Sequence, residues 1–184
     1  MLSLTALMGF LLLSGGAAPA YAAVPVVPSY TVTLTAYNAV PAQTDSSPLE
    51  TASGAYSNPE VVAARSPDLA GTLPFGTIIE IDGSSASSTD TCGYDVVAPH
   101  IGYRVIADTM NAHYTDRVDV LLPTNADYTT ADKGKRNAAQ VLGVCSGVTV
   151  RVVGYVAINR IPKTQAALAA LVTGDTSTPL ALQY

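Results

Sequence analysis

The chain has 184 residues, of which 48% are hydrophobic and only 12% are charged, and this composition excludes an intrinsically disordered protein. The length allows one domain with a hydrophobic core and short extensions. The formal net charge is −5 and the isoelectric point is about 4.7, which argues against partners such as nucleic acid or anionic lipid surfaces, because both select for basic patches.

The first 22 residues have the pattern of a signal peptide. An apolar run over residues 2–13 is followed by small residues that end in Ala20-Tyr-Ala22. No Lys or Arg precedes the run, which leaves open whether the true start lies upstream, and a retained anchor is the alternative to cleavage. Because the run is short for a membrane span, we predict cleavage near Ala22, export to the cell envelope or beyond, and a linker over residues 23–29.

Short strand-like runs alternate with long loops along the rest of the chain. Residues 31–37 alternate polar and apolar side chains, which is typical of a strand with one face in water. Residues 38–58 are rich in Pro, Ser, Thr and Gly, and predict a long surface loop. Further strands or short apolar runs are expected at residues 61–64, 77–81, 103–107, 118–122 and 147–156, the last bent at Gly154.

Helix is expected to be sparse. Pro67-Asp68 opens a loop or a helical turn, and the polar residues 125–137 favour a helix or a turn. Residues 164–172 have helical composition with Thr164 as a cap, and the tail from residue 174 is expected to be mobile. About six short strands with long loops therefore predict a mainly β protein, a six-stranded β-barrel with a short C-terminal helix.

The two cysteines, Cys92 and Cys145, predict a disulfide if the chain is exported. The alternative is a pair of buried thiols, and metal binding by two isolated cysteines is less favoured than either. The two histidines, His100 and His113, share no ligand spacing, so we predict neither a metal site nor a cofactor.

Two carboxylates stand in apolar strand-like runs, Asp108 in Tyr103-Arg-Val-Ile-Ala-Asp-Thr-Met-Asn111 and Asp119 in Arg117-Val-Asp-Val-Leu-Leu122. In a strand, Asp119 points away from its valine neighbours and shares a face with Leu121, which argues against full exposure. That face is either plain solvent or a functional cleft. Asp108 either caps an Asx-turn or faces the same cleft, where burial and mutual repulsion would raise one of the two pKa values.

Several short motifs together resemble the three-aspartate (3D) domain family. The matching pieces, in order, are Thr35-Ala-Tyr37, Gln43-Thr-Asp-Ser-Ser-Pro48, Thr51-Ala-Ser-Gly54, residues 63–69, Leu73-Pro-Phe-Gly-Thr77, Ala107-Asp-Thr-Met-Asn111 and Val118-Asp-Val120. That family is a double-psi β-barrel, shared with membrane-bound lytic transglycosylase A. The resemblance implies such a barrel over residues 30–158 and a C-terminal extension over residues 159–184.

The family's three aspartates correspond to Asp68, Asp108 and Asp119 in this chain. The match of Asp68 requires a one-residue insertion, because it lies eight rather than seven residues before Gly76. A more distant similarity to rare lipoprotein A and expansin barrels lacks their histidine before Leu-Pro-Phe-Gly. In that segment this chain has Arg65 and Asp68.

The resemblance implies cleavage of the β-1,4 bond between N-acetylmuramic acid and N-acetylglucosamine in peptidoglycan glycan strands. Asp119 would be the acid and base, Asp108 would tune it or bind sugar hydroxyls, and Asp68 would orient the substrate. Substrate-binding residues are predicted at Tyr37, Thr51, Ser53 and Asn111, with a place in the core as the equal alternative for Tyr37. A non-catalytic wall-binding module and a structural domain with turn-capping aspartates remain the alternative functions, and the oligomeric state is left open.

Overall fold

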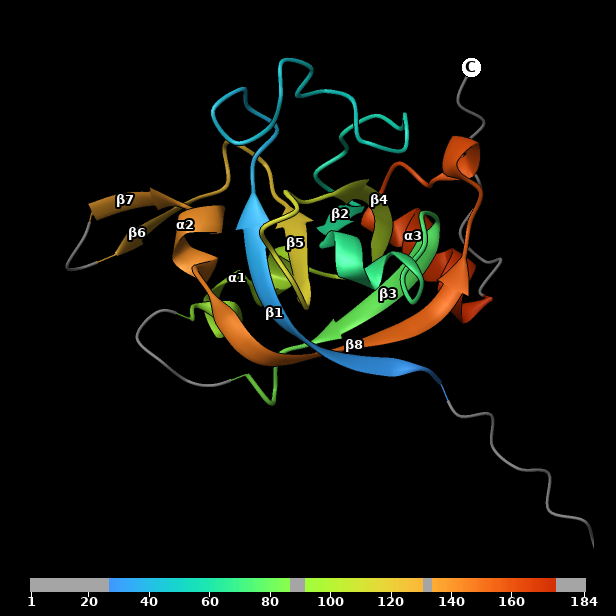
Figure 1. Ribbon diagram of the computed structural model, residues 1–184. Coiled ribbons are helices and arrows are strands. Elements are labelled where there is room, and N and C mark those ends of the chain that lie inside the picture. Colours follow the sequence, from blue (N-terminus) through green and yellow to red (C-terminus); the bar gives the residue numbers. More distant parts are fainter. Residues whose placement is uncertain (1–26, 87–91, 131–133, 175–184) are drawn as a thin grey trace, which may run out of the picture.

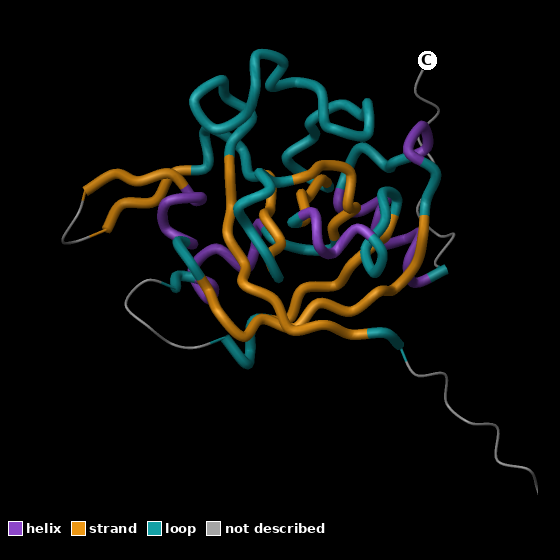
Figure 2. The backbone as a smooth tube through the Cα atoms, in the orientation of Figure 1, coloured by secondary structure: helices purple, strands orange, loops and turns teal. Residues whose placement is uncertain are grey.

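The computed structural model describes residues 27–86, 92–130 and 134–174. The predicted signal peptide, the predicted linker up to residue 26 and the predicted mobile tail beyond residue 174 lie outside these ranges. Figure 1 shows strands wrapped around one centre, with a long loop above them, and Figure 2 shows the same path coloured by secondary structure.

Six strands close into a barrel, and this confirms the predicted mainly β fold class with a short C-terminal helix. The strands are β1 (Ser29–Tyr37), β2 (Val62–Arg65), β3 (Thr77–Asp82), β4 (Arg104–Thr109), β5 (Arg117–Leu121) and β8 (Cys145–Tyr155). Around the barrel they follow the order β1-β5-β2-β4-β3-β8. The pairs β1/β5 and β2/β4 are parallel and the other pairs are antiparallel.

The strand order contains an internal twofold relation. Exchanging β1, β2 and β3 with β4, β5 and β8 reproduces each neighbouring pair of strands, and parallel pairs stay parallel. The barrel is therefore built from two interlocked three-strand halves, as expected of a double-psi barrel.

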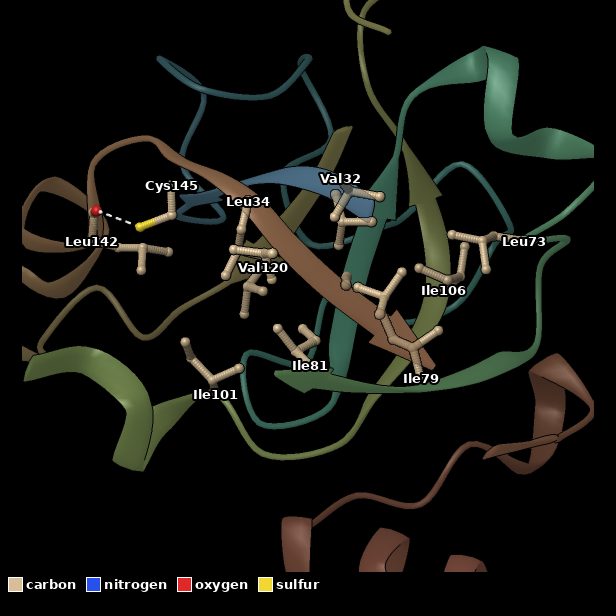
Figure 3. Packing of buried hydrophobic residues seen from close by; sticks show 14 of the residues in the cluster. Val32, Leu34, Leu73, Ile79, Ile81, Ile101, Ile106, Val120, Leu142 and Cys145 are labelled. Atoms are coloured by element: carbon tan, nitrogen blue, oxygen red, sulfur yellow. Dashed lines mark hydrogen bonds between the residues drawn. The ribbon is translucent and has the colours of Figure 1, made fainter. Parts of the chain in front are cut away.

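The inside of the barrel is filled by alternate residues of its strands, which follows from the two-residue period of β structure. Figure 3 shows these side chains pointing toward one another from different strands. The labelled barrel residues are Val32 and Leu34 of β1, Ile79 and Ile81 of β3, Ile106 of β4, Val120 of β5 and Cys145 of β8. A second buried cluster lies on the outer face and includes Ala64, Leu121 and Leu168.

The described residues of the polar segment 125–137 begin with a turn at Asn125 and then form two paired strands, so a helix there is wrong and the predicted turn is confined to the start. Its strands are β6 (Asp127–Thr130) and β7 (Gly134–Asn137), which pair antiparallel. Residues 127–130 read Asp-Tyr-Thr-Thr, and aromatic and β-branched side chains favour strands even where the sequence is polar. Helix starts directly afterwards, because the Asn137 side chain accepts a hydrogen bond from the Ala139 amide.

The helical elements of the described residues are short. They are the α-helices α1 (Tyr94–Val97), α2 (Ala138–Leu142) and α3 (Gln165–Thr173) and the 3-10 turns η1 (Pro67–Ala70), η2 (Ala98–His100) and η3 (Ile158–Arg160). The predicted turn at Pro67 and the predicted Thr164 cap are confirmed, and the Thr164 hydroxyl accepts a hydrogen bond from the Ala167 amide. Within the described ranges, no helix combines the length and the apolar character needed to cross a membrane.

The predicted disulfide between Cys92 and Cys145 is confirmed, and it ties the start of β8 to the segment before α1. It closes a loop with a sequence separation of 53 residues. We expect replacement of both cysteines by serine to lower the free energy of unfolding by about 4 kcal/mol, the loop-closure entropy of a link of this length. Urea unfolding measures this loss. A reducing agent should weaken the original protein to the same level and leave the variant unchanged, and equal stability of the two proteins would contradict the expectation.

Candidate functional site

A cleft of about 820 Å³ lies on the outer face of the barrel. The loop that joins β1 to β2, which arches over the barrel in Figure 1, forms one wall, and the segment that joins β4 to β5 forms another. The lining residues are Tyr37, Gln43, Thr44, Asp45, Ser47, Pro48, Glu50, Thr51, Ala52, Ser57, Ala64, Asp108, Thr109, Met110, Asn111, Tyr114 and Asp119. Both aspartates of the strand-like runs therefore face one cleft.

Strand register sets the distance between the two aspartates. Thr35 of β1 pairs with Asp119 of β5, Asp119 pairs with Ala64 of β2, and Ala64 pairs with Asp108 of β4. Paired residues lie on the same face of a sheet, so the four side chains form a row across four strands. Strands are about 4.8 Å apart, which places the backbones of Asp119 and Asp108 roughly 10 Å from each other with only a methyl group between them.

Asp119 is a partly buried carboxyl group with one hydroxyl donor. The Thr35 hydroxyl donates a hydrogen bond of 2.9 Å to its Oδ1 atom. Burial raises the pKa of Asp119 to about 6, and the negative charge of Asp108 adds a smaller effect in the same direction. The Thr35 hydrogen bond and the charge of Arg117 act against this rise in pKa. Burial prevails, and Asp119 can hold or release a proton near neutral pH.

Asp108 lies in a network of hydrogen-bond donors that fixes its orientation. Its Oδ2 atom accepts a hydrogen bond of 2.9 Å from the Tyr37 hydroxyl, and its Oδ1 atom accepts bonds of 2.9 Å from the Ala52 and Thr109 amides. The predicted alternative of an Asx-turn cap is wrong, because the Met110 amide donates to the carbonyl of Arg65 instead. The carboxylate of Asp108 therefore binds the β1–β2 loop to the barrel.

Tyr37 is both a residue of the core and a residue that lines the cleft, the two alternatives predicted for it. Its side chain is 8% exposed and packs in the second buried cluster, yet it also lines the cleft. Burial and the neighbouring Asp108 raise the pKa of Tyr37 above its ordinary value, so the phenol stays protonated and donates to Asp108.

The other predicted substrate-binding residues occupy different places. Thr51 and Asn111 line the cleft. Ser53 is not among the lining residues, but its hydroxyl lies 3.0 Å from the Thr51 hydroxyl and its amide donates to the Ala107 carbonyl. Ser53 thus stabilises the wall of the cleft through these contacts without lining the cleft itself.

The structure does not bring Asp68 to the cleft. The residue lies on η1, and its Oδ2 atom accepts a hydrogen bond of 2.9 Å from the Asp116 amide. Hydrogen bonding by the Ser66 hydroxyl and by the Asp116 amide lowers the pKa of Asp68 below its ordinary value. Asp68 therefore holds the segment between β4 and β5 rather than a substrate.

Sequence reasoning gave no site role to most of the other lining residues, among them Asp45, Glu50, Ala64 and Tyr114. The carboxylates of Asp45 and Glu50 join Asp108 and Asp119, while the lining residues include neither Lys nor Arg. Such a cleft repels anionic ligands and suits neutral or cationic ones. Tyr114 could have been identified from the sequence, because an aromatic residue close to the Asp108 motif is a candidate for ligand binding. Ala64 could not, because a lone alanine in an apolar run does not indicate a binding site.

Within the described ranges, no three side chains of His, Cys, Asp or Glu gather closely enough to hold a metal ion. Comparison of the chain with family models, with curated proteins and with solved structures found no match.

Proposed function

We propose that the protein is an exported lytic transglycosylase of peptidoglycan, with Asp119 as its single acid and base. The observation that carries this proposal is the carboxyl group of Asp119, which faces a cleft and whose pKa is raised to about 6. The ordered motifs that resemble the three-aspartate family, and the six-stranded barrel on which Asp108 and Asp119 share one face, support it further.

The reaction needs one group that first gives and then takes a proton. Protonated Asp119 donates its proton to the oxygen that links N-acetylmuramic acid to N-acetylglucosamine, and the bond from C1 to that oxygen breaks. The carboxylate then accepts the proton of the C6 hydroxyl of the muramic acid, whose oxygen bonds to C1 and closes a 1,6-anhydro ring. Asp119 regains its proton and no water is consumed, unlike in hydrolysis by paired carboxylates.

The remaining groups of the cleft have supporting parts in this proposal. Asp108 holds the β1–β2 loop against the barrel, and its charge helps to keep the proton on Asp119. Asn111 offers polar groups to sugar hydroxyls, whereas the buried Thr51 hydroxyl is hydrogen-bonded to Ser53 and Ala55 and shapes the wall of the cleft. The sugar rings of the glycan are neutral where the carboxyl group of the muramic acid is amide-linked to a peptide, which fits a cleft lined by four carboxyl groups and no lysine or arginine.

Digestion of purified peptidoglycan, followed by mass spectrometry of the soluble products, tests this function. Products that carry 1,6-anhydromuramic acid are the expected result. Soluble products with a free reducing end would indicate a hydrolase instead. Absence of products together with sedimentation of the protein on the wall material would favour the non-catalytic binding module.

The methyl group of Ala64 separates the two aspartates, and a larger side chain would fill the floor of the cleft. We expect Ala64→Leu to lower glycan cleavage by about 10²-fold or more, because a displacement of the substrate by 1 Å can cost this much. The released products measure the loss. The exposed Ala157 offers a matched control, because Ala157→Leu adds the same atoms away from the cleft. Full activity of Ala64→Leu would contradict the proposed position of the substrate.

A further inference from the structure

Tyr114 lies at the edge of the cleft and has no part in the chemistry proposed above. It belongs to the segment between β4 and β5, lines the cleft and is 42% exposed. An exposed aromatic side chain that borders a polar cleft offers a large apolar surface there.

A cation holds the ring of Tyr114 from one side. The guanidinium carbon of Arg117 lies 4.6 Å from the centre of the ring, within the range of a cation–π contact. Arg117 begins β5, two residues before Asp119, and its amide donates a hydrogen bond of 3.0 Å to the Ser66 hydroxyl. The ring is therefore packed against a residue of the barrel that also carries the proposed acid.

The segment that carries Tyr114 is fixed at several points. The Tyr114 amide donates to the Asn111 carbonyl, and the Asp116 carbonyl accepts a hydrogen bond from the Thr33 amide. Asp116 has a φ of 48°, a left-handed conformation that aspartate tolerates better than most residues, and its amide donates to Asp68. Asp68 thus anchors the turn that presents Tyr114.

We propose that Tyr114 is a stacking subsite for one neutral sugar ring of the glycan, held by Arg117 and by the Asp68–Asp116 hydrogen bond. This inference rests on the proposed function, because it assigns the ligand class of the same cleft.

The chemistry of the surroundings selects a sugar. A pyranose has an apolar face of C–H groups that stacks on an aromatic ring, and hydroxyls at its edge that need hydrogen-bond partners. Asn111 supplies such a partner beside Tyr114, since its Oδ1 atom accepts from the His113 amide and its amide NH₂ group remains a donor. Anionic rings such as nucleotides are disfavoured by the four carboxylates of the cleft.

Binding of a hexamer of β-1,4-linked N-acetylglucosamine, measured by calorimetry, tests this subsite. All proteins carry Asp119→Asn, so that turnover does not interfere. We expect Tyr114→Ala to weaken binding roughly tenfold, while Tyr114→Phe stays within about twofold because the ring face is kept. Asp68→Ala should weaken binding by about threefold through the loosened turn, and it should speed hydrogen exchange at the Asp116 amide. Tyr155→Ala, an equally drastic change of an exposed tyrosine outside the cleft, should bind as well as the parent protein.

Equal binding by Tyr114→Ala and the parent protein would overturn the subsite, and so would a Tyr114→Phe variant as weak as Tyr114→Ala. Failure of the parent protein to bind the hexamer would overturn it as well. Digestion of peptidoglycan by the protein with Asp119 intact is scored separately. Cleavage without Tyr114-dependent binding would refute only the subsite, and Tyr114-dependent binding without cleavage would refute only the enzymatic function.

Discussion

Replacement of Asp119 by asparagine should abolish release of 1,6-anhydro products, with a loss of about 10³-fold or more. Asparagine matches the shape of aspartate and can still accept the hydrogen bond from the Thr35 hydroxyl, but it can neither donate nor accept the transferred proton. The rate of product release from peptidoglycan measures the effect. Asp95→Asn, which removes one exposed carboxylate of α1 outside the cleft, is the matched control for the change in charge.

The same substitution should make the protein more stable at pH 7.5. The pKa of Asp119 is raised to about 6 in the folded protein and returns to its ordinary value of 3.8 on unfolding. The folded state therefore binds more protons between these values, and stability falls as the pH rises through them. Asparagine removes this penalty, which corresponds to at most about 3 kcal/mol. Urea unfolding at pH 7.5 should show the gain for Asp119→Asn, and at pH 3.5 the two proteins should be nearly equal.

The pH dependence of cleavage follows from the same proton. The first step needs the protonated form of Asp119, so kcat/KM should fall about tenfold for each pH unit above 6. A rate that stays constant from pH 5 to pH 8 would contradict the assignment of Asp119 as the acid. Retention of activity by Asp119→Asn together with an unchanged stability would contradict both the catalytic role and the burial that raises its pKa.

The strand pattern made much of the barrel predictable. The alternating residues 31–37 and the apolar run 77–81 lie within β1 and β3, and the run 118–122 matches β5 except for its last residue, because a half-buried strand imposes a period of two on its side chains. The hairpin of β6 and β7 was missed because its polar residues carry no such period. Its strands extend away from the barrel, and their shape depends on pairing with each other (Figure 1).

The candidate site was predictable only in part. The two aspartates stand out in a sequence because carboxylates are rare inside apolar runs, and they do share one cleft. Their spacing across Ala64 depends on strand register between segments that are distant in the chain, and one sequence does not encode that register visibly. For Asp68 the motif was misleading, because it assigned this residue to the substrate, whereas hydrogen bonds with the Ser66 hydroxyl and the Asp116 amide hold it outside the cleft.

Arg104 is the least expected residue of the core, because a lone arginine at the start of a strand gives no sign of burial. Its side chain is completely buried, and its guanidinium donates only to backbone carbonyls among the hydrogen bonds of the described residues. The acceptors are Pro59, Val62, His100, Ile101 and Leu121. Burial lowers the pKa of Arg104 to about 9, so the group still carries its charge at neutral pH.

Replacement of Arg104 by methionine should lower the free energy of unfolding by about 4 kcal/mol. Methionine fills a similar length of space, but it leaves several buried carbonyls without a donor, and each such group costs about 1–3 kcal/mol. The free energy of unfolding of Arg104→Lys should lie between those of the original protein and Arg104→Met. The ammonium group keeps the charge, but it lacks the planar guanidinium that reaches several carbonyls at once. Urea unfolding of both variants measures the loss, with the exposed Arg160→Met as the control that should change little.

The acceptors of Arg104 connect this core group to the site. Val62 belongs to β2, the strand of Ala64, and Leu121 belongs to β5, the strand of Asp119. One guanidinium therefore donates hydrogen bonds to the backbones of both strands and links them to each other. Folded Arg104→Met protein should therefore show weaker glycan cleavage than the original protein, because register between β2 and β5 sets the row of side chains in the cleft. A variant with undiminished stability would mean that other donors, such as water, satisfy these carbonyls. A destabilised variant with full activity would separate the core arginine from the geometry of the site.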